Sequence, residues 1–507
     1  MRSAGKWSVL AILAFALALI SLDNTIVNVA LPSLQEDLKA TTAELQWVVD
    51  AYSVLFAGTL LLAGGLGDRF GRKRILMIGL VIFGLGSLAA GAAPDATLLI
   101  ACRALMGIGG AFIMPSTLSI LVQTFRAPSE RAQAIGVWAA VAGVGVAIGP
   151  IVGGLLLEHF SWHAVFLVNP PLVVIVFILT LLFVPESKDA TKPQLDLRGA
   201  ALSSLGLIAL VTFIVELPDS GITALTSGAL VAAIVFLTLF VWWEKRAPRP
   251  LLPMELFSER VFTVAVVTVG LVYFALMGAL FFLPQFLQLV QGLSPLQSGI
   301  GMLPGAGGLL VASLVSPRVA ERWGARNTVV TGVGLVAVGL LSMSFVEPMT
   351  SYPYVGFALG VTGIGMGLAL PQGTNAVLSK VPRERSGMGS AVNDAVSELG
   401  GSFGVAILGG IVAFSYRARI DDAIAALGDS ASAVPQQALA AVRESLASAT
   451  VLVQQLPKEI ADPARDITGR AFVSGMGWAL TVGAVVAALG ALLAWRFFPV
   501  RMERVEE

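Results

Sequence analysis

The chain has 507 residues, of which 56% are hydrophobic and 13% are charged, and its 32 basic and 32 acidic side chains cancel. A soluble protein of this length would need far more surface charge, so most of the chain is expected to lie in the lipid bilayer. The zero net charge argues against nucleic acid as a partner. The single cysteine, Cys102, excludes an internal disulfide, and the two histidines, His159 and His163, have no acidic companion at zinc-site spacing.

The amino-terminal segment has Arg2 and Lys6 in front of an apolar run that starts at Trp7. A signal peptide begins in the same way, but this run continues to Pro32 without a convincing cleavage site, so we expect an uncleaved first span. No G-x-x-x-x-G-K-[ST] loop occurs, which predicts that the protein has no ATP site of its own. Uphill transport would then draw on an ion gradient or on a partner, and no cofactor other than protons is expected.

Apolar segments of the chain are long enough to cross a hydrocarbon core of about 30 Å, which takes roughly 20 residues. Fourteen such segments lie near residues 8–31, 46–66, 75–93, 97–122, 132–157, 164–184, 199–217, 224–243, 262–289, 297–316, 328–346, 352–372, 388–414 and 472–497. Every second short gap is basic, as between Arg69 and Arg74, and the other short gaps carry acids or no charge. Since basic loops stay in the cytoplasm, this alternation predicts fourteen spans with both termini inside.

The first span contains the sequence LDNTIVNVALP, in which Asp23 lies well inside the apolar run and Asn24 and Asn28 are one turn apart. Asp50 lies about one turn into the second span, and Arg103 lies in the fourth. Because successive spans alternate in direction, Asp23, Asp50 and Arg103 are expected at comparable depths in the outer half of the membrane. There they would form an acid–base cluster that loads and releases a proton. The alternative is a structural role in which Arg103 ties the fourth span to the first.

A glycine-rich, basic stretch, GGLGDRFGRKRIL, follows the second span and fits the pattern G-x-L-x-D-R-x-G-R-K-x-x-L without a mismatch. It resembles the signature between helices 2 and 3 of the major facilitator superfamily. Asp68 can accept hydrogen bonds from a neighbouring helix end or from an arginine. We expect Asp68 and Arg72 to form a cytoplasmic latch that holds the outward-open state, with Arg131 of the next cytoplasmic loop as a third partner. The residues expected in this gate are Gly64, Asp68, Arg69, Gly71, Arg72 and Arg131.

Three more patterns carry the same resemblance. LDNTIVNVALP is similar to the first-helix signature of the fourteen-helix drug:proton antiporters. Leu99, Arg103, Gly107 and Gly110 resemble the signature L-x3-R-x2-Q-G, although Met106 replaces the usual glutamine and thereby weakens the proton-handling role of Arg103. The fifth span resembles the antiporter signature G-x8-G-x3-G-P-x2-G-G, with Gly136, Gly145, Gly149, Pro150, Gly153 and Gly154. Its glycines would let another helix pack against bare backbone and Pro150 would permit a bend, generic packing being the alternative.

The chain also contains an internal repeat. SPRVAERWGARNTVV, from Ser316, repeats the glycine-rich stretch in degenerate form, so that Asp68 aligns with Glu321 and Gly71 with Gly324, each 253 positions apart. Two parallel halves of six helices with two helices inserted between them would give this offset. We therefore divide the chain into a first half, 1–184, a linker with two extra spans, 185–260, and a second half, 261–507.

The thirteenth span carries the sequence NDAVSELGGSFG, in which Asp394 and Glu398 are four residues apart and share one helix face. Two carboxylates this close repel each other and favour one shared proton, which an organic cation would displace. The resemblance supports this view, because drug exporters of the family carry acids in this helix. The alternative is a packing role, with the carboxylate hydrogen-bonded to Asn393 or to a backbone carbonyl.

A weaker signal comes from aromatic and amide side chains that would line a central cavity and stack on an apolar ring system. Most aromatic residues in such a chain face lipid, so we expect only about half of this set to line the cavity. Together with Asn24, Asn28 and Asn393, the candidates are Trp47, Tyr52, Trp138, Tyr273, Phe281, Phe282, Gln285, Gln288 and Asn375.

The last outer gap, about 415–471, is much longer than the others and is rich in alanine, with helical patches interrupted at Pro435 and Pro457. We expect two short amphipathic helices that form an extracellular hairpin, and the alternative is a loosely ordered tether.

The sequence therefore predicts an all-α integral membrane protein with two six-helix halves, two inserted helices and both termini in the cytoplasm. No nucleophile–base pair or metal cluster is evident, so we expect no enzyme. The resemblance implies a multi-pass, proton-driven exporter of hydrophobic or cationic compounds in the bacterial plasma membrane, working as a monomer. An exporter of an endogenous lipid, metabolite or siderophore is one alternative, and a non-transporting receptor or scaffold is another.

Overall fold

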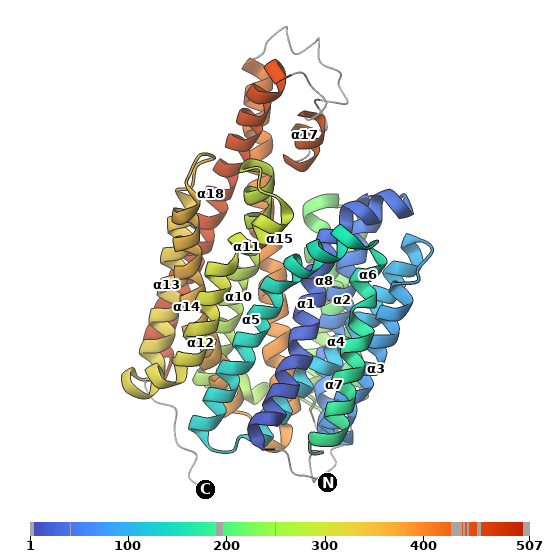
Figure 1. Cartoon of the computed structure of the whole chain (residues 1–507). Coiled ribbons are helices and arrows are strands. Elements are labelled where there is room, and N and C mark those ends of the chain that lie inside the picture. The colour runs from blue at the N-terminus through green and yellow to red at the C-terminus, as the bar shows by residue number, and fades with distance from the viewer. Residues whose placement is uncertain are drawn as a thin grey trace.

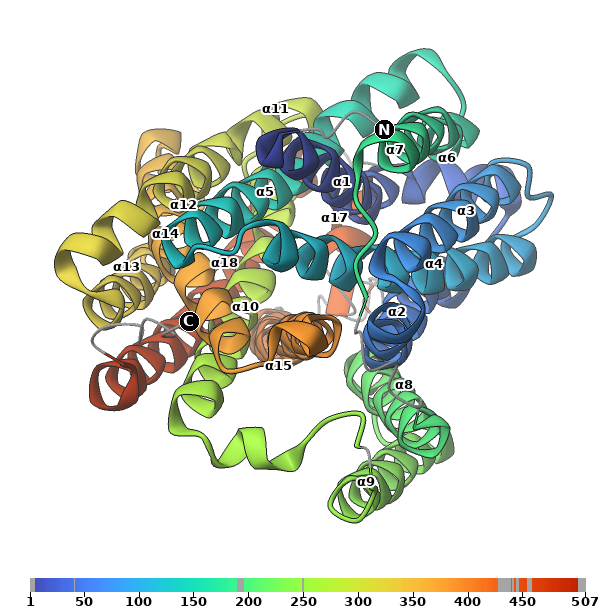
Figure 2. The ribbon, with the colours of Figure 1, turned by 90° about the horizontal axis from the view of Figure 1, so that it is seen from below.

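The computed structural model of the chain describes residues 5–40, 42–188, 196–248, 250–426, 439, 442–443, 446–453 and 458–499. The regular secondary structure in this part of the chain is all helical, and it contains no strand. Figure 2 shows two groups of helices side by side, one built from the first part of the sequence and the other from the last part, with a separate pair of helices at their edge. The all-α fold expected from the sequence is confirmed.

The first group consists of α1 to α7. The long apolar segments form one helix each, except the sixth, which is divided into a short and a longer helix before Asn169. The bounds are α1 Lys6–Leu38, α2 Thr42–Phe70, α3 Arg72–Ala90, α4 Ala96–Thr124, α5 Pro128–His159, α6 His163–Leu167 and α7 Asn169–Phe183.

The two helices after the first group, α8 Leu197–Ser220 and α9 Ala224–Glu244, pack against each other as a hairpin. Asp196 caps the start of α8 by accepting from the Gly199 amide, and it also accepts a hydrogen bond of 2.7 Å from the Trp243 indole near the end of α9. α8 packs against α2 of the first group and α15 of the second. The hairpin therefore lies where the two groups meet.

The second group begins with a 3₁₀ turn, η1 Met254–Ser258, and contains the remaining helices. α10 passes directly into a π-helical turn, η2, and α11 is followed at once by α12. The bounds are α10 Arg260–Gln285, η2 Phe286–Val290, α11 Pro295–Gly301, α12 Leu303–Trp323, α13 Ala325–Ser344, α14 Tyr352–Ser379, η3 Arg383–Arg385, α15 Ser386–Ala426, α17 Leu446–Val453 and α18 Lys458–Phe497.

Thirteen helical segments in the described part of the chain are long and apolar enough to cross a membrane. α5 is not one of these thirteen, although it has 32 residues and packs between α1 and α12. The count of fourteen spans, the cytoplasmic placement of the termini and the division at residues 184 and 260 stay predictions.

The internal repeat has a counterpart in the backbone. Gly71 before α3 and Gly324 before α13 both have positive φ angles, 115° and 87°, which a side chain would strain. Two residues later in the repeat alignment, Lys73 donates to the Leu181 carbonyl of α7, and Arg326 donates to the Phe498 carbonyl after α18. In each half a basic side chain thus holds the end of the half's last helix.

The sequence-based expectation for the long outer gap is wrong in one respect. The patch that begins at Ile420 is no separate short helix, because α15 continues without a break to Ala426 and α18 starts as early as Lys458. Tyr416 and Ile420, four residues apart, are both buried and extend the apolar stripe of α15. Figure 1 shows α15 and α18 projecting beyond the other helices, with α17 beside them.

The projection is held together by side chains as well. Tyr416 donates 3.0 Å to the Val442 carbonyl, and Arg443 pairs with Asp421 at 2.7 Å. Pro435 and Pro457, where the sequence suggested helix breaks, lie outside the described residues.

Candidate functional site

A buried ion pair connects α1 and α4. Asp23 is fully buried and Arg103 is 1% exposed, and Nη1 of Arg103 lies 2.6 Å from Oδ2 of Asp23. Removing two charges from water costs several kcal/mol for each ion, so a pair of this kind needs hydrogen bonds for its remaining polar atoms. The sequence predicted that Asp23 and Arg103 lie together, and the structure brings them into contact.

The second oxygen of Asp23 is bound by a residue that the sequence analysis missed. Asn169, the first residue of α7, donates 2.6 Å to Oδ1 of Asp23 and 3.0 Å to the hydroxyl of Ser87 in α3. Ser87 in turn donates to the Phe166 carbonyl. Side chains from four helices and a backbone carbonyl of α6 therefore form one buried network, and both carboxylate oxygens of Asp23 accept a hydrogen bond.

Two residues of α2 also contact Arg103. Its Nε donates 3.0 Å to the Val48 carbonyl, and its guanidinium lies 4.6 Å above the centre of the Tyr52 ring, a cation–π geometry. Gly110 makes this approach possible, because a Cβ there would lie 2.5 Å from the Tyr52 hydroxyl. Asp50 lies half-buried on the same helix. Its membership of the cluster stays a prediction.

Met106, which replaces the glutamine of the family pattern, lies in an apolar contact between helices. Met106 is completely buried and packs against α3, where a Cβ on Gly86 would lie 2.8 Å from its side chain. The side chain at this position therefore faces the interior between α3 and α4.

The two acids of α15 have a different environment. Asp394 is 1% exposed and accepts 3.1 Å from the amide of its neighbour Asn393, while Glu398 is half-buried and faces Ser53 of α2. Tyr273 of α10 faces both acids. Within the described ranges no ion pair joins either acid to a basic side chain. Among the described contacts, Asp394 and Glu398 thus lack the basic partner that Asp23 has.

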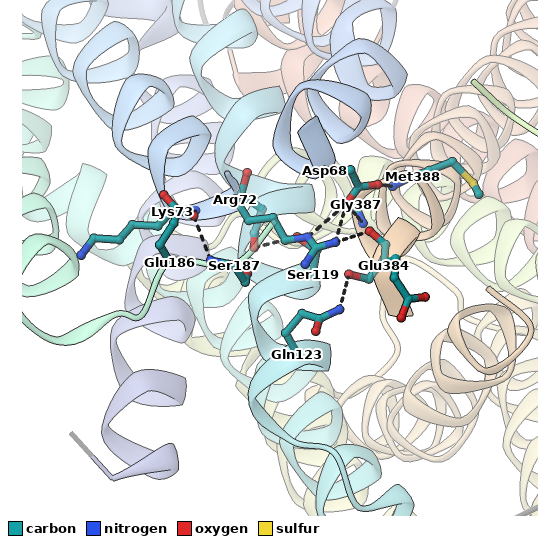
Figure 3. A network of polar contacts seen from close by, with 12 residues as sticks. Asp68, Arg72, Lys73, Ser119, Gln123, Glu186, Ser187, Glu384, Gly387 and Met388 are labelled. Atoms are coloured by element: carbon teal, nitrogen blue, oxygen red, sulfur yellow. Dashed lines mark hydrogen bonds and ion pairs between the residues drawn. The ribbon is translucent and has the colours of Figure 1, made fainter. Parts of the chain in front are cut away.

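A second polar network lies at the end of α2, where the two groups of helices meet (Figure 3). Asp68 and Arg72, 3% and 1% exposed, form an ion pair of 2.6 Å. Asp68 also accepts from the amides of Gly387, at 2.9 Å, and Met388, at 3.0 Å, at the start of α15. Arg72 donates 2.6 Å to the Glu384 carbonyl.

This network gives Asp68 both kinds of donor that the sequence analysis expected, a helix end and an arginine. The carboxylate of one group caps the positive end of a helix in the other, which favours contact between them. Gly64 lies one turn before Asp68, and a Cβ there would come 2.5 Å from the Gly387 carbonyl. Small side chains therefore let α2 and α15 approach closely enough for the latch to form.

The segment after α7 contacts the start of α3, next to the latch. Glu186 accepts from the Lys73 amide at 3.1 Å, and the Arg72 amide donates to the Ser187 carbonyl at 2.9 Å. Arg69, expected in the gate, lies 5.2 Å from the Phe70 ring.

Arg131 of α5 takes part in a separate contact between the groups. Its Nε donates 3.1 Å to the side-chain oxygen of Asn375 in α14, and both residues are buried. Gln123 of α4 donates to Ser386 of α15 at 3.3 Å. Asn375, expected in a substrate cavity, takes part in a contact that joins α5 to α14, and its place in a cavity stays a prediction.

The glycine signature of α5 faces two different neighbours. Cβ atoms on Gly145, Gly149 and Gly153 would all meet α1, whereas a Cβ on Gly136 would lie 2.5 Å from the Ser313 carbonyl of α12. A Cβ on Gly154 would meet nothing within 4 Å. The side chain of Pro150 lies outside what the structure describes. α5 therefore packs by bare backbone against α1 in its own group and against α12 in the other.

The remaining cavity candidates fall into two sets. Trp138 and Phe282 are 4% and 1% exposed, and the Trp138 indole donates to Thr117 at 3.2 Å, so both side chains belong to the packed interior. Phe281, in contrast, is 48% exposed. The side chain of Asn28 is outside the described part. The candidates with open surface are Asn24, Trp47, Tyr273, Phe281, Gln285 and Gln288.

Comparisons with known proteins give one consistent result. The family model of the Major Facilitator Superfamily matches residues 13–405. The chain is 37% identical to the "Multidrug efflux pump LfrA" of Mycolicibacterium smegmatis, over 96% of this chain and 94% of that protein. It is 33% identical to the "Methyl viologen resistance protein SmvA" of Salmonella typhimurium, over 97% and 98%.

A third relative is the "Tetracenomycin C resistance and export protein" of Streptomyces glaucescens, which is 32% identical over 96% of this chain and 91% of that protein. Among solved structures, the human organic anion transporter MFSD10 superposes with a TM-score of 0.63 at 14% identity, over 97% of this chain and all of that one. The proton:xylose symporter XylE gives the same TM-score at 13% identity, over 97% and 96%. At these low identities, the two structures support only the fold of this chain.

Proposed function

Because this chain belongs to the major facilitator superfamily, we propose that it exports hydrophobic or cationic drugs and other toxic compounds across the bacterial plasma membrane in exchange for protons. The relatives named for multidrug efflux, methyl viologen resistance and tetracenomycin export support this proposal, since each covers more than nine tenths of the chain. Methyl viologen is an aromatic dication, which favours a cationic substrate class. The substrate would bind between the two halves and reach either side by alternating access.

The topology that we infer has fourteen spans, with α5 as the fourteenth, and both termini in the cytoplasm. The 32 residues of α5 are more than the roughly 20 that a bilayer core requires, and the basic loops on one side of the span pattern favour this orientation. The Asp68–Arg72 latch then lies on the cytoplasmic side and the α15–α18 projection outside. Since the latch is closed, the described conformation is closed toward the cytoplasm.

The observation that carries the proposal is the contrast between the two sets of buried acids. Asp23 accepts hydrogen bonds from Arg103 and from Asn169, so both of its oxygens have a partner and one of these partners is a cation. Asp394 has an amide neighbour but no basic partner among the described side chains. An acid without a cation is where a positively charged drug and a proton can replace each other.

In the proposed cycle, Asp394 and Glu398 therefore exchange the proton for the drug, while Asp23 and Arg103 remain an ion pair that fixes α1 to α4. A proton that enters from outside would neutralise the α15 acids and release the cation outward. Return of the proton to the cytoplasm would restore the site. Asp50 remains a further candidate on the path.

The proposal can be tested in inverted membrane vesicles that carry a respiratory proton gradient and a pH-sensitive dye. Addition of methyl viologen should dissipate the gradient with the wild type but not with Asp394→Asn or Glu398→Gln. Both variants should fold as the wild type does, shown by an unchanged thermal unfolding midpoint, but should bind methyl viologen more weakly in equilibrium binding to purified protein, because each lacks one of the acids that attract the cation. If wild-type vesicles respond to no cation, or if both variants respond as the wild type does, the proposed exchange is wrong.

A further inference from the structure

A groove of about 960 Å³ lies outside the polar networks, between α8, α15 and α18. Its walls are apolar and include Phe213 and Leu217 of α8, Phe403 and Phe414 of α15, and Trp478 of α18. Phe414 is 79% exposed and Trp478 is 62% exposed. In a helix bundle that crosses a membrane, these surfaces face lipid and not water.

The depth of the groove follows from the length of α15. Arg419, which lines the groove at one end, lies 31 residues after Met388, whose amide belongs to the latch. This separation corresponds to a rise of about 46 Å along an α-helix, and a bilayer with its headgroups is about 40–45 Å thick. Arg419 therefore lies at the outer edge of the headgroup layer opposite the latch, at the base of the projection, and Phe403 lies deep in the hydrocarbon.

The charge at the rim selects between possible occupants. A guanidinium at the headgroup end repels a lipophilic cation and attracts a phosphate, with which arginine forms strong paired hydrogen bonds. We propose that this groove binds a phospholipid with a net negative headgroup, its acyl chain along Phe403 and Phe414 and its phosphate on Arg419. In the orientation inferred above, the lipid comes from the outer leaflet.

Such a lipid would occupy a joint between the two halves. α8 packs on α2 of the first half, while α15 and α18 belong to the second half. When the halves rock, the groove between them must change shape, so an occupant that fits the described conformation stabilises that conformation. The inserted hairpin α8–α9 thereby gains a role as one wall of a lipid site.

Two glycines of α15 provide a matched pair of variants. Gly410 lines the groove and Gly409 does not, and a Cβ on either residue would meet no atom within 4 Å. Gly410→Leu should therefore fill the groove without disturbing the fold, and Gly409→Leu should place the same side chain outside it. Arg419→Ala and Arg417→Ala form a second pair, because both arginines are exposed on α15 and only Arg419 lines the groove.

The test is native mass spectrometry of the full-length purified protein, titrated with palmitoyl-oleoyl phosphatidylglycerol and, separately, with the phosphatidylcholine of the same chains. We expect tighter binding of phosphatidylglycerol, a loss of about tenfold in its affinity for Gly410→Leu, and a loss of about fivefold for Arg419→Ala. Gly409→Leu and Arg417→Ala should bind as the wild type does.

Equal binding of the two lipids, or equal losses within either pair of variants, would overturn the proposal. Tighter binding of methyl viologen to the wild type than to Gly410→Leu would instead identify the groove as a drug site. The lipid titration needs no transport, so it can fail or succeed independently of the proposed drug export.

Discussion

At the scale of single residues, the surroundings of Asp23 differ from those of an ordinary buried acid. Each carboxylate oxygen has its own donor, one charged and one neutral, and the donors come from α4 and α7. The Asp23–Arg103 ion pair and the Asn169 hydrogen bond therefore connect α1 to both of these helices through one buried carboxylate. The pair is better suited to hold helices together than to carry a proton.

Asn169 tests this interpretation. Asn169→Leu has nearly the same size but removes the donor to both Asp23 and Ser87, so two buried oxygens lose a partner. We expect a loss of about 1–3 kcal/mol in stability and a clear decrease in export. Thermal unfolding of the purified protein in detergent, together with the vesicle assay, measures both.

The matched control for Asn169 lies on the same helix. Thr180 is fully buried, and its hydroxyl is unpaired among the described contacts, so Thr180→Val should leave stability and export unchanged or improve stability. If Asn169→Leu behaves like Thr180→Val, the Asn169 hydrogen bonds contribute nothing and Asp23 needs another explanation.

At the scale of elements, the glycines of α5 pack against two different helices, although they belong to one sequence signature. Gly145, Gly149 and Gly153 are spaced by four and form the face toward α1, whereas Gly136 meets α12 of the other half. A change on the first face alters the packing inside one half. A change at Gly136 alters the contact between the halves, which the transport cycle must break and remake.

Gly145 and Gly154 provide the corresponding prediction. A Cβ on Gly145 would lie 2.8 Å from that of Ser21 and 3.0 Å from the Ala18 carbonyl, so Gly145→Ala should cost about 1–3 kcal/mol by overpacking. Gly154→Ala meets no atom and should stabilise α5 by up to about 1 kcal/mol through helix propensity. Thermal unfolding midpoints that move in the same direction for both variants would contradict this assignment.

The sequence predicted features that depend on one helix better than features that depend on how helices meet. Asp394 and Glu398 could be placed on one face from their spacing, and the glycine-rich loop could be placed beside a helix end. Asn169 could not be found, because its partner is 146 residues away and an Asn before two prolines also fits an ordinary span start. The end of α15 was missed because the alanine-rich patch that begins at Ile420 was interpreted as a new helix, although buried Tyr416 and Ile420 continue the old one.

At the scale of the whole molecule, the two halves are related in sequence but not in function. Both copies of the loop motif have a glycine with positive φ and a basic side chain that holds the last helix of the half. Asp68 is buried against α15, whereas its counterpart Glu321 is exposed. Both copies of the motif thus keep the glycine and the basic side chain that holds the last helix, whereas only the first copy forms the latch.

This asymmetry predicts which half controls the cytoplasmic gate. Asp68→Asn keeps one acceptor but turns an amide toward the Gly387 or Met388 N–H, so the latch should weaken by about 2 kcal/mol, a roughly thirtyfold shift toward the cytoplasm-open state. Glu321→Gln makes the same chemical change at the counterpart position and should shift nothing.

Distances between spin labels on the two halves can measure the shift. Arg74→Cys and Trp323→Cys place labels on exposed positions, 72% and 61% exposed, and Cys102→Ala removes the chain's own thiol. The wild type and Glu321→Gln should give mainly the shorter label-to-label distance of the closed state. Asp68→Asn should add a population at the longer distance of the cytoplasm-open state. If Asp68→Asn leaves the distribution unchanged, the contacts of Arg131 and Gln123 between the halves suffice to close the gate, and Asp68 acts only as a helix cap.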